Sequence, residues 1–163
     1  PGKPADSSKR LKLTDVEDTR FLHCNIKTLN LLVNVMAAEK AESMGCGECV
    51  FHRGDVVTEC AHSNVSIIKD GIFKTHPTDH YILPGITRMH IIQICKDNGI
   101  PVDETPFTMA ELMDADEIIV SSSTKFCSPA CEMNGTPIGG KAPELVKLIQ
   151  EKYMEKFENE TAN

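Results

Sequence analysis

Four short runs of strand-forming residues, joined by tight turns, lie in the middle of the chain and constrain its fold more than any other feature. They cover residues 48–52, 56–60, 64–69 and 72–76. Arg53-Gly54-Asp55 separates the first two runs and Asp70-Gly71 separates the last two, and such glycine-containing turns are typical of β-hairpins. The pattern therefore predicts antiparallel strand pairs.

Helical periods lie on both sides of these strands. Apolar residues at Leu31, Leu32, Val35 and Met36 predict a helix from Lys27 to Met44, ended by Gly45. Thr108 and Glu111 form a capping box at the start of a short helix. Other helices are predicted at 86–98 and 142–157, and other strands at 13–23, 102–107 and 117–121. This mixture predicts an α+β fold of the pseudobarrel kind, with mostly antiparallel strands flanked by helices.

Charge and length exclude several classes of function. The net charge of −7 argues against a nucleic-acid or anionic-membrane surface, because both require a basic face. No apolar run is long enough to span a bilayer, and the first residues lack the apolar core of a secretory signal. We expect a cytoplasmic protein in which residues 1–12, rich in Pro, Ser and Lys, form a linker and residues 13–163 form one domain.

The seven cysteines are spread through the chain in an odd number, which favours reduced thiols over a disulfide framework. Cys46 and Cys49 form a CxxC pair, which is found in redox motifs and in half of a zinc site. Because a zinc site needs two more close ligands, an isolated pair is a weak signal, and we expect no metal.

Three stretches, CNIKTLNLL, VVTECAHSN and LPGITR, occur in this order. They supply an amine (Lys27), a carboxylate (Glu59) and a glycine-led helix start that binds anions through backbone N–H groups. This set is what a protein needs to bind pyridoxal 5′-phosphate. Each residue also has a simpler interpretation, since a lone lysine at a helix start is usually solvated and Glu59 would face water on an edge strand.

The segment VEDTRFLHCNIKTLNLL resembles the VEDxRxLxCDIKSLNLL stretch of the D-amino-acid aminotransferases, which are class IV (fold-type IV) enzymes. The resemblance runs from about Leu13 to about Tyr153. It implies that Lys27 binds the cofactor covalently and carries the proton during catalysis, and that Glu59 pairs with the pyridine nitrogen.

By the same resemblance, the amides of Ile86 and Thr87 bind the phosphate. A hydroxyl assists them, with Ser123 preferred and Ser122 as the alternative. His62 stands where the family commonly has serine. It would either face the substrate or be a neutral, hydrogen-bonded histidine.

The resemblance implies transamination between a D-amino acid and a 2-oxo acid in a homodimer. It also implies that the family's N-terminal domain is absent here, so that this chain is expected to have little activity alone. Cys60 in TECAHSN leaves open an aminodeoxychorismate lyase-like reaction. A non-catalytic domain remnant is a third possibility, against which the presence of both Lys27 and Glu59 counts.

Overall fold

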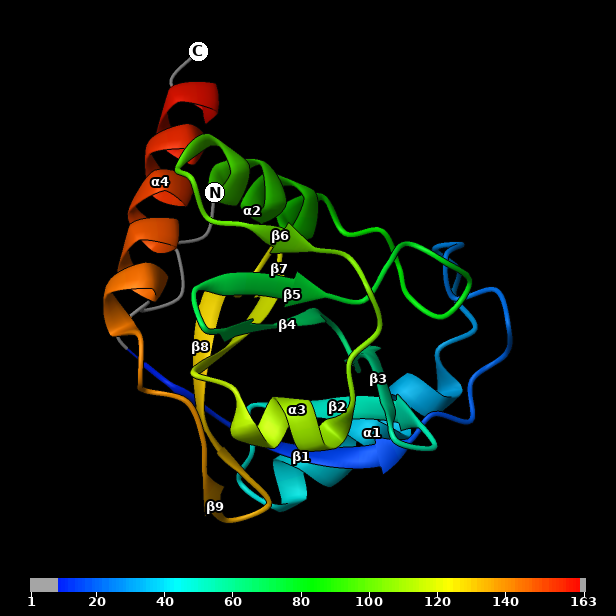
Figure 1. Cartoon of the computed structure of the whole chain (residues 1–163). Coiled ribbons are helices and arrows are strands. Elements are labelled where there is room, and N and C mark those ends of the chain that lie inside the picture. Colours follow the sequence, from blue (N-terminus) through cyan, green and yellow to red (C-terminus); the bar gives the residue numbers. More distant parts are fainter. Residues whose placement is uncertain (1–8, 162–163) are drawn as a thin grey trace.

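In the computed structural model, which describes residues 9–161, nine strands form one curled, mixed sheet (Figure 1). The strand order is β3-β2-β1-β8-β7-β4-β5-β6, and β9 pairs with β8. The strands are β1 (Leu11–Glu17), β2 (Glu48–Arg53), β3 (Val56–Cys60), β4 (Asn64–Lys69), β5 (Ile72–Thr75), β6 (Val102–Asp103), β7 (Glu117–Ser122), β8 (Phe126–Met133) and β9 (Thr136–Pro137). The four predicted hairpin strands are therefore confirmed.

The long strand β8 joins the two halves of this sheet. It pairs with β1 in parallel on one side and with β7 antiparallel on the other. The hairpins β2–β3 and β4–β5 are antiparallel, as is β4–β7, whereas β1–β2 and β5–β6 are parallel. The expected arrangement of mostly antiparallel strands is confirmed.

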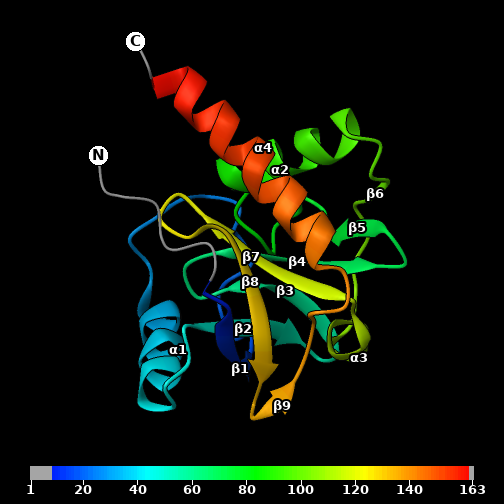
Figure 2. The same ribbon diagram turned by 90° about the vertical axis from the view of Figure 1, so that its left-hand side faces the viewer.

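Four helices, α1 (Leu32–Ser43), α2 (Ile86–Asp97), α3 (Met109–Asp114) and α4 (Pro143–Thr161), flank the sheet within the described range. Figure 2 shows α2 and α4 at one end of the molecule and α1 at the other. No helix in residues 9–161 is both long and apolar enough to cross a membrane.

Three apolar clusters hold these layers together. The first fills the interior of the curled sheet and includes Leu13, Val50, Val65, Ile118 and, from α3, Leu112. A second cluster packs α2 and α4 against the outer face of β4, β5 and β7, and a third packs Ala37 and Ala41 of α1 near Phe51 of β2. Because aromatics make up only 5% of the chain, aliphatic side chains carry most of this burial.

The helix predicted from Lys27 begins instead at Leu32. The backbone before Leu32 forms a turn instead. In this turn the Asn30 amide donates to Oγ1 of Thr28 at 3.2 Å, and the Leu31 amide donates to the carbonyl oxygen of Leu29 at 2.9 Å. Local side-chain bonds of this kind compete with helix formation. The stretch from Lys27 to Leu31 is therefore loop.

Other predicted boundaries also moved. Strand β1 starts at Leu11 and ends at Glu17, because the Asp18 carboxylate accepts from the Arg20 amide at 3.1 Å and turns the chain. The strand predicted at 102–107 is only Val102–Asp103, and α4 extends to Thr161. The Thr108–Glu111 capping box is confirmed, with reciprocal bonds of 2.8 and 3.1 Å. Residues 1–8 of the predicted linker lie outside the described range.

Candidate active site

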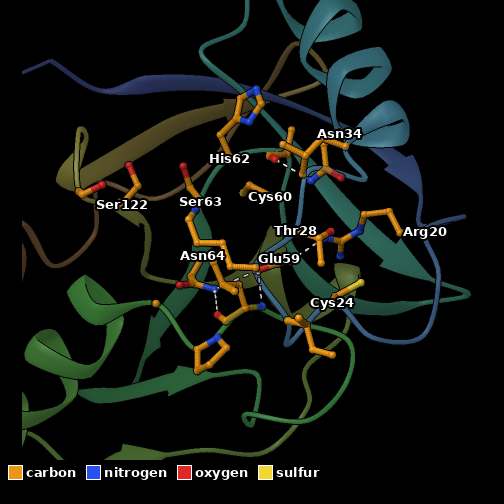
Figure 3. A pocket seen from close by; sticks show the side chains of 18 of the residues that line it. Arg20, Cys24, Thr28, Asn34, Glu59, Cys60, His62, Ser63, Asn64 and Ser122 are labelled. Carbon is orange, nitrogen blue, oxygen red and sulfur yellow. Dashed lines mark hydrogen bonds and ion pairs between the residues drawn. The ribbon is translucent and has the colours of Figure 1, made fainter.

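A cavity of about 640 Å³ lies where the loop after β1, the β3–β4 turn and the start of α2 meet (Figure 3). Its lining includes all the site residues predicted from the sequence: Lys27, Glu59, His62, Ile86, Thr87, Ser122 and Ser123. These residues come from four separate parts of the chain. The fold thus brings together an amine, a carboxylate, a helix start and hydroxyl groups in one cavity.

Lys27 lies on the loop between β1 and α1, at the exposed edge of the cavity. The loop is attached to the body of the protein by the Cys24 amide, which donates to the carbonyl oxygen of His80 at 2.9 Å. Cys24 itself is buried and also lines the cavity. The Lys27 amine can therefore reach the cavity from a loop rather than from a helix start.

Glu59, on β3, is only 5% exposed and forms part of the cavity wall. One carboxylate oxygen, Oε1, accepts from Arg20 at 2.6 Å, and Oε2 accepts from Asn64 and from the Leu83 amide at 3.1 and 3.0 Å. Burial raises the pKa of Glu59 to about 7, against the opposing effect of the Arg20 charge. The water-facing interpretation of this glutamate is wrong.

Arg20 is a site residue that the sequence interpretation missed. Its guanidinium also donates to both oxygens of Asp18, at 2.9 Å each, and lies 4.4 Å from the centre of the Phe51 ring. Burial alone would lower the pKa of Arg20, but the carboxylates of Asp18 and Glu59 more than offset burial and raise the pKa above its usual value. The Asp-x-Arg spacing was the available signal. In an extended chain this spacing places Asp18 and Arg20 on the same face, but it does not reveal the contact with Glu59, which is 39 residues away.

The start of α2 leaves its first amides without a side-chain partner. Gly85 is the N-cap and makes no side-chain capping bond, and the first turn contains no acidic residue. The hydroxyl of Thr87 pairs with Tyr153 of α4 at 3.4 Å. A helix start with open N–H groups carries partial positive charge and suits an anion such as phosphate.

The two candidate serines differ in their surroundings. Oγ of Ser122 accepts from the Lys125 amide at 3.0 Å and lies 3.3 Å from the Thr124 hydroxyl, so that it already closes the turn after β7. The Ser123 hydroxyl makes no hydrogen bond to the part of the chain that the structure describes. Of the two hydroxyls, that of Ser123 is therefore the less engaged, and the preference for Ser123 as the hydroxyl donor stays a prediction.

A buried carboxylate behind the cavity was also missed. Glu48 accepts at Oε2 from Lys125 at 2.6 Å and from Ser63 at 2.8 Å. Lys125 directly follows residues 122–124, which form the serine turn after β7, and Ser63 lines the cavity. The Glu48–Lys125 ion pair thereby attaches the serine turn to β2 from behind.

His62 is exposed and lines the cavity on the β3–β4 turn. The backbone of this turn is held by Asn34 of α1, which donates to the carbonyl oxygen of Ala61 at 2.8 Å. Within residues 9–161 the His62 ring makes no hydrogen bond. The ring is therefore accessible to whatever enters the cavity.

Comparison with known proteins gives a family match over residues 1–133, to amino-transferase class IV. A D-alanine aminotransferase from Listeria monocytogenes is 48% identical over 136 residues, covering 82% of this chain and 47% of that protein. The D-alanine aminotransferase of Staphylococcus haemolyticus is 46% identical over 154 residues, covering 92% and 55%. The chain therefore spans about half the length of the curated relatives it matches.

Solved structures agree with this match. The crystal structure of a branched-chain aminotransferase from the archaeon Thermoproteus uzoniensis with norvaline superposes with a TM-score of 0.78 at 27% identity, covering 94% of this chain and 53% of that one. The curled mixed sheet with flanking helices is thus the fold of these proteins.

Proposed function

The chain belongs to the class IV aminotransferases, and from this membership we propose that it is the cofactor-binding part of a pyridoxal-phosphate enzyme. The reaction we propose transfers an amino group between a D-amino acid, of the D-alanine type, and a 2-oxo acid. The observation that supports it most is that Lys27, Glu59 and the open start of α2 line one cavity.

The residues present fit the cofactor. Cavities for small ligands typically measure roughly 300–1,000 Å³, and this one measures about 640 Å³. It offers an amine, a buried carboxylate, open helix amides and serine hydroxyls, which match an aldehyde, a ring nitrogen and a phosphate. When bound, pyridoxal phosphate supplies an electron sink for the substrate's α-carbon.

In this proposal, Nζ of Lys27 forms the covalent attachment and later moves the proton. Glu59 holds a proton or positive charge at the ring nitrogen, and Arg20 fixes the carboxylate in place. The amides of Ile86 and Thr87 bind the phosphate with the hydroxyl of Ser123, or of Ser122. The exposed ring of His62 contacts the substrate side.

We also propose a homodimer and a further domain that completes the cleft. A set of apolar side chains around the cavity loop and on α1 is exposed, namely Leu22, Ile26, Leu29, Leu32, Val35 and Met36. Exposed apolar patches of this kind mark interaction surfaces. The cytoplasmic location remains a prediction from the sequence.

The first test is borohydride reduction of the purified chain with pyridoxal phosphate, followed by mass spectrometry of its peptides. We expect the pyridoxyl group on Lys27, and no label on that peptide in Lys27→Ala. Lys147→Ala is the matched control, because the Lys147 side chain is 75% exposed on α4 and lies outside the cavity lining, so its replacement should leave the labelling unchanged. Labelling scattered over many lysines would contradict the proposed site.

The reaction itself is tested on the protein containing both domains. With D-alanine, a transaminase converts its cofactor to the amine form, which absorbs at a different wavelength, whereas an aminodeoxychorismate lyase-like enzyme cleaves its substrate without that conversion. A protein that neither binds the cofactor nor gains stability from it would support the non-catalytic alternative.

A further inference from the structure

Asn64, the first residue of β4, connects two parts of the cavity wall that are distant in sequence. Both hydrogens of its side-chain amide are used, since Nδ2 donates to Oε2 of Glu59 at 3.1 Å and to the carbonyl oxygen of Leu83 at 2.9 Å. The Leu83 amide donates to the same Oε2 at 3.0 Å. Glu59, Asn64 and Leu83 thus form a closed ring of three hydrogen bonds, and Figure 3 shows Glu59 and Asn64 next to each other in the cavity wall.

Close packing strengthens this connection at Gly85. A Cβ atom added to Gly85 would lie 2.2 Å from Oδ1 of Asn64, which is far inside contact distance. The backbone of Gly85 has a φ of −65°, a value that any residue adopts. Glycine is therefore required here because the Asn64 amide approaches the turn, not because of backbone strain.

The same residue is also tied to the serine turn. Asn64 is 6% exposed, and its backbone pairs in register with Ser121 of β7, immediately before Ser122. Asn64 consequently touches the carboxylate, the turn into α2 and the strand that leads to the candidate serines. A buried amide with both hydrogens used has one orientation, so it fixes these elements relative to one another.

We propose that Asn64 is a positioning residue that sets the spacing between Glu59 and the start of α2. It does so by holding Leu83 and Gly85 against the carboxylate, and the inference rests on the proposed function of this cavity. A ligand with a ring nitrogen at one end and a phosphate at the other then meets two partners already held at the right separation. Preorganisation of this kind strengthens binding of the whole ligand more than binding of its separate parts.

The test compares three ligands by calorimetry: pyridoxine 5′-phosphate, pyridoxine and inorganic phosphate. None carries the aldehyde that reacts with lysine, so binding is read without catalysis or covalent attachment. In Asn64→Ala we expect the Kd for the whole ligand, pyridoxine 5′-phosphate, to rise about tenfold or more. The Kd for each of the two fragments, pyridoxine and inorganic phosphate, should change less than about threefold.

A purely structural role would weaken the fragments in proportion to the whole ligand, and that result would overturn the inference. So would an unchanged Kd for pyridoxine 5′-phosphate, or a loss confined to pyridoxine, which would mean that Asn64 acts on Glu59 alone. If the wild-type chain binds none of the three ligands, the proposed function and this inference both fail. If it binds them and Asn64→Ala makes no difference, only this inference fails.

Thr14→Val is the matched control for lost stability. Thr14 is fully buried in β1 and donates to Oδ1 of Asn134 at 2.8 Å, outside the cavity lining. The variant should lower the unfolding midpoint while leaving the ratio of whole-ligand to fragment affinities unchanged.

Gly85→Ala provides a second route if Asn64→Ala does not fold. It keeps every hydrogen-bonding group but pushes the Asn64 amide away from the turn. We expect the same selective loss of pyridoxine 5′-phosphate binding. Where Asn64→Ala does fold, Gly85→Ala should also lower the unfolding midpoint of the unliganded protein less in the Asn64→Ala background than in the wild type. Equal losses in both backgrounds would show that the contact does not set the spacing.

Discussion

Replacing Arg20 with methionine removes the cation that lies between two buried carboxylates. The side chain of Arg20 is 6% exposed, that of Glu59 is 7% exposed and that of Asp18 is fully buried. Arg20 contacts Glu59 at 2.6 Å and Asp18 at 2.9 Å. Methionine fills similar volume without charge, so the variant removes the cation and its hydrogen bonds while changing the packing little.

The expected loss is large because both carboxylates remain in the interior. Removing one partner of a buried ion pair costs about 3–5 kcal/mol. For a domain of this length, 1 kcal/mol corresponds to roughly 2–4 °C in Tm. We therefore expect a Tm about 6–20 °C lower at pH 8.

The pH dependence has a definite sign. Burial alone would raise the pKa of Asp18, but the hydrogen bonds and charge of Arg20 hold it below its usual value. Without Arg20 the pKa values of Asp18 and Glu59 both rise, and protonation then relieves the unpaired charges. The deficit of Arg20→Met relative to the wild type should therefore be greatest at pH 8 and shrink towards pH 5.

Thermal unfolding for the Tm and urea unfolding for the free energy, both followed by far-ultraviolet circular dichroism, suit this test, because the chain has no tryptophan to report by fluorescence. Arg53→Met is the control: Arg53 also approaches Asp18, at 3.4 Å, but its side chain is 24% exposed and the loss should be smaller. A deficit under about 1 kcal/mol at pH 8, or one that grows as the pH falls, would refute the reasoning.

Three further predictions follow from individual contacts. The pKa of Glu59 is about 7 in the folded protein against an ordinary 4.5, so the folded state holds the Glu59 proton more tightly than the unfolded state does. The stabilisation from this difference is fully present below pH 4.5, and about 3 kcal/mol of free energy of unfolding is lost as the pH rises through 7. Glu59→Gln should flatten that slope in urea titrations at a series of pH values, and an unchanged slope would contradict it. Thr108→Ala should cost about 1 kcal/mol in urea unfolding by removing the α3 cap, unlike exposed Thr136→Ala. A thiol reagent should label the half-buried Cys46 and Cys131 in the folded protein, before it unfolds. The buried cysteines should react only on unfolding, because burial raises the pKa of several of these thiols, namely Cys49, Cys60, Cys95 and Cys127. Labelling of the buried cysteines in the folded protein would contradict this prediction.

The sequence predicted those parts of the fold that depend on local signals. The hairpin turns and the Thr108 capping box involve neighbours in the chain, and the structure confirms them. The start of α1 was misplaced because the apolar period continued through Leu31, whereas the hydroxyl of Thr28 binds the Asn30 amide and interrupts the helix. Periodicity does not reveal such competition.

For the site, the predicted residues all line one cavity, but the residues that hold them were not found. Arg20, Glu48 and Asn64 act through partners 39, 77 and 5 residues away, respectively. Even for Asn64, the nearest in sequence, the second contact is with Leu83, 19 residues on. Contacts of this kind depend on how strands are ordered, which no pattern in a single sequence specifies.

The position of β8 has a consequence for how the chain reaches its folded state. β8 lies between β1 and β7 in the sheet, and its pairing with β1 places Leu11 opposite Ala130. During synthesis β1 emerges before β8 and must wait for about 120 further residues before one of its edges is covered. Pairing between such distant segments slows folding, and an uncovered edge attracts other strands. Chains truncated before residue 126 should therefore depend on chaperones and accumulate in inclusion bodies.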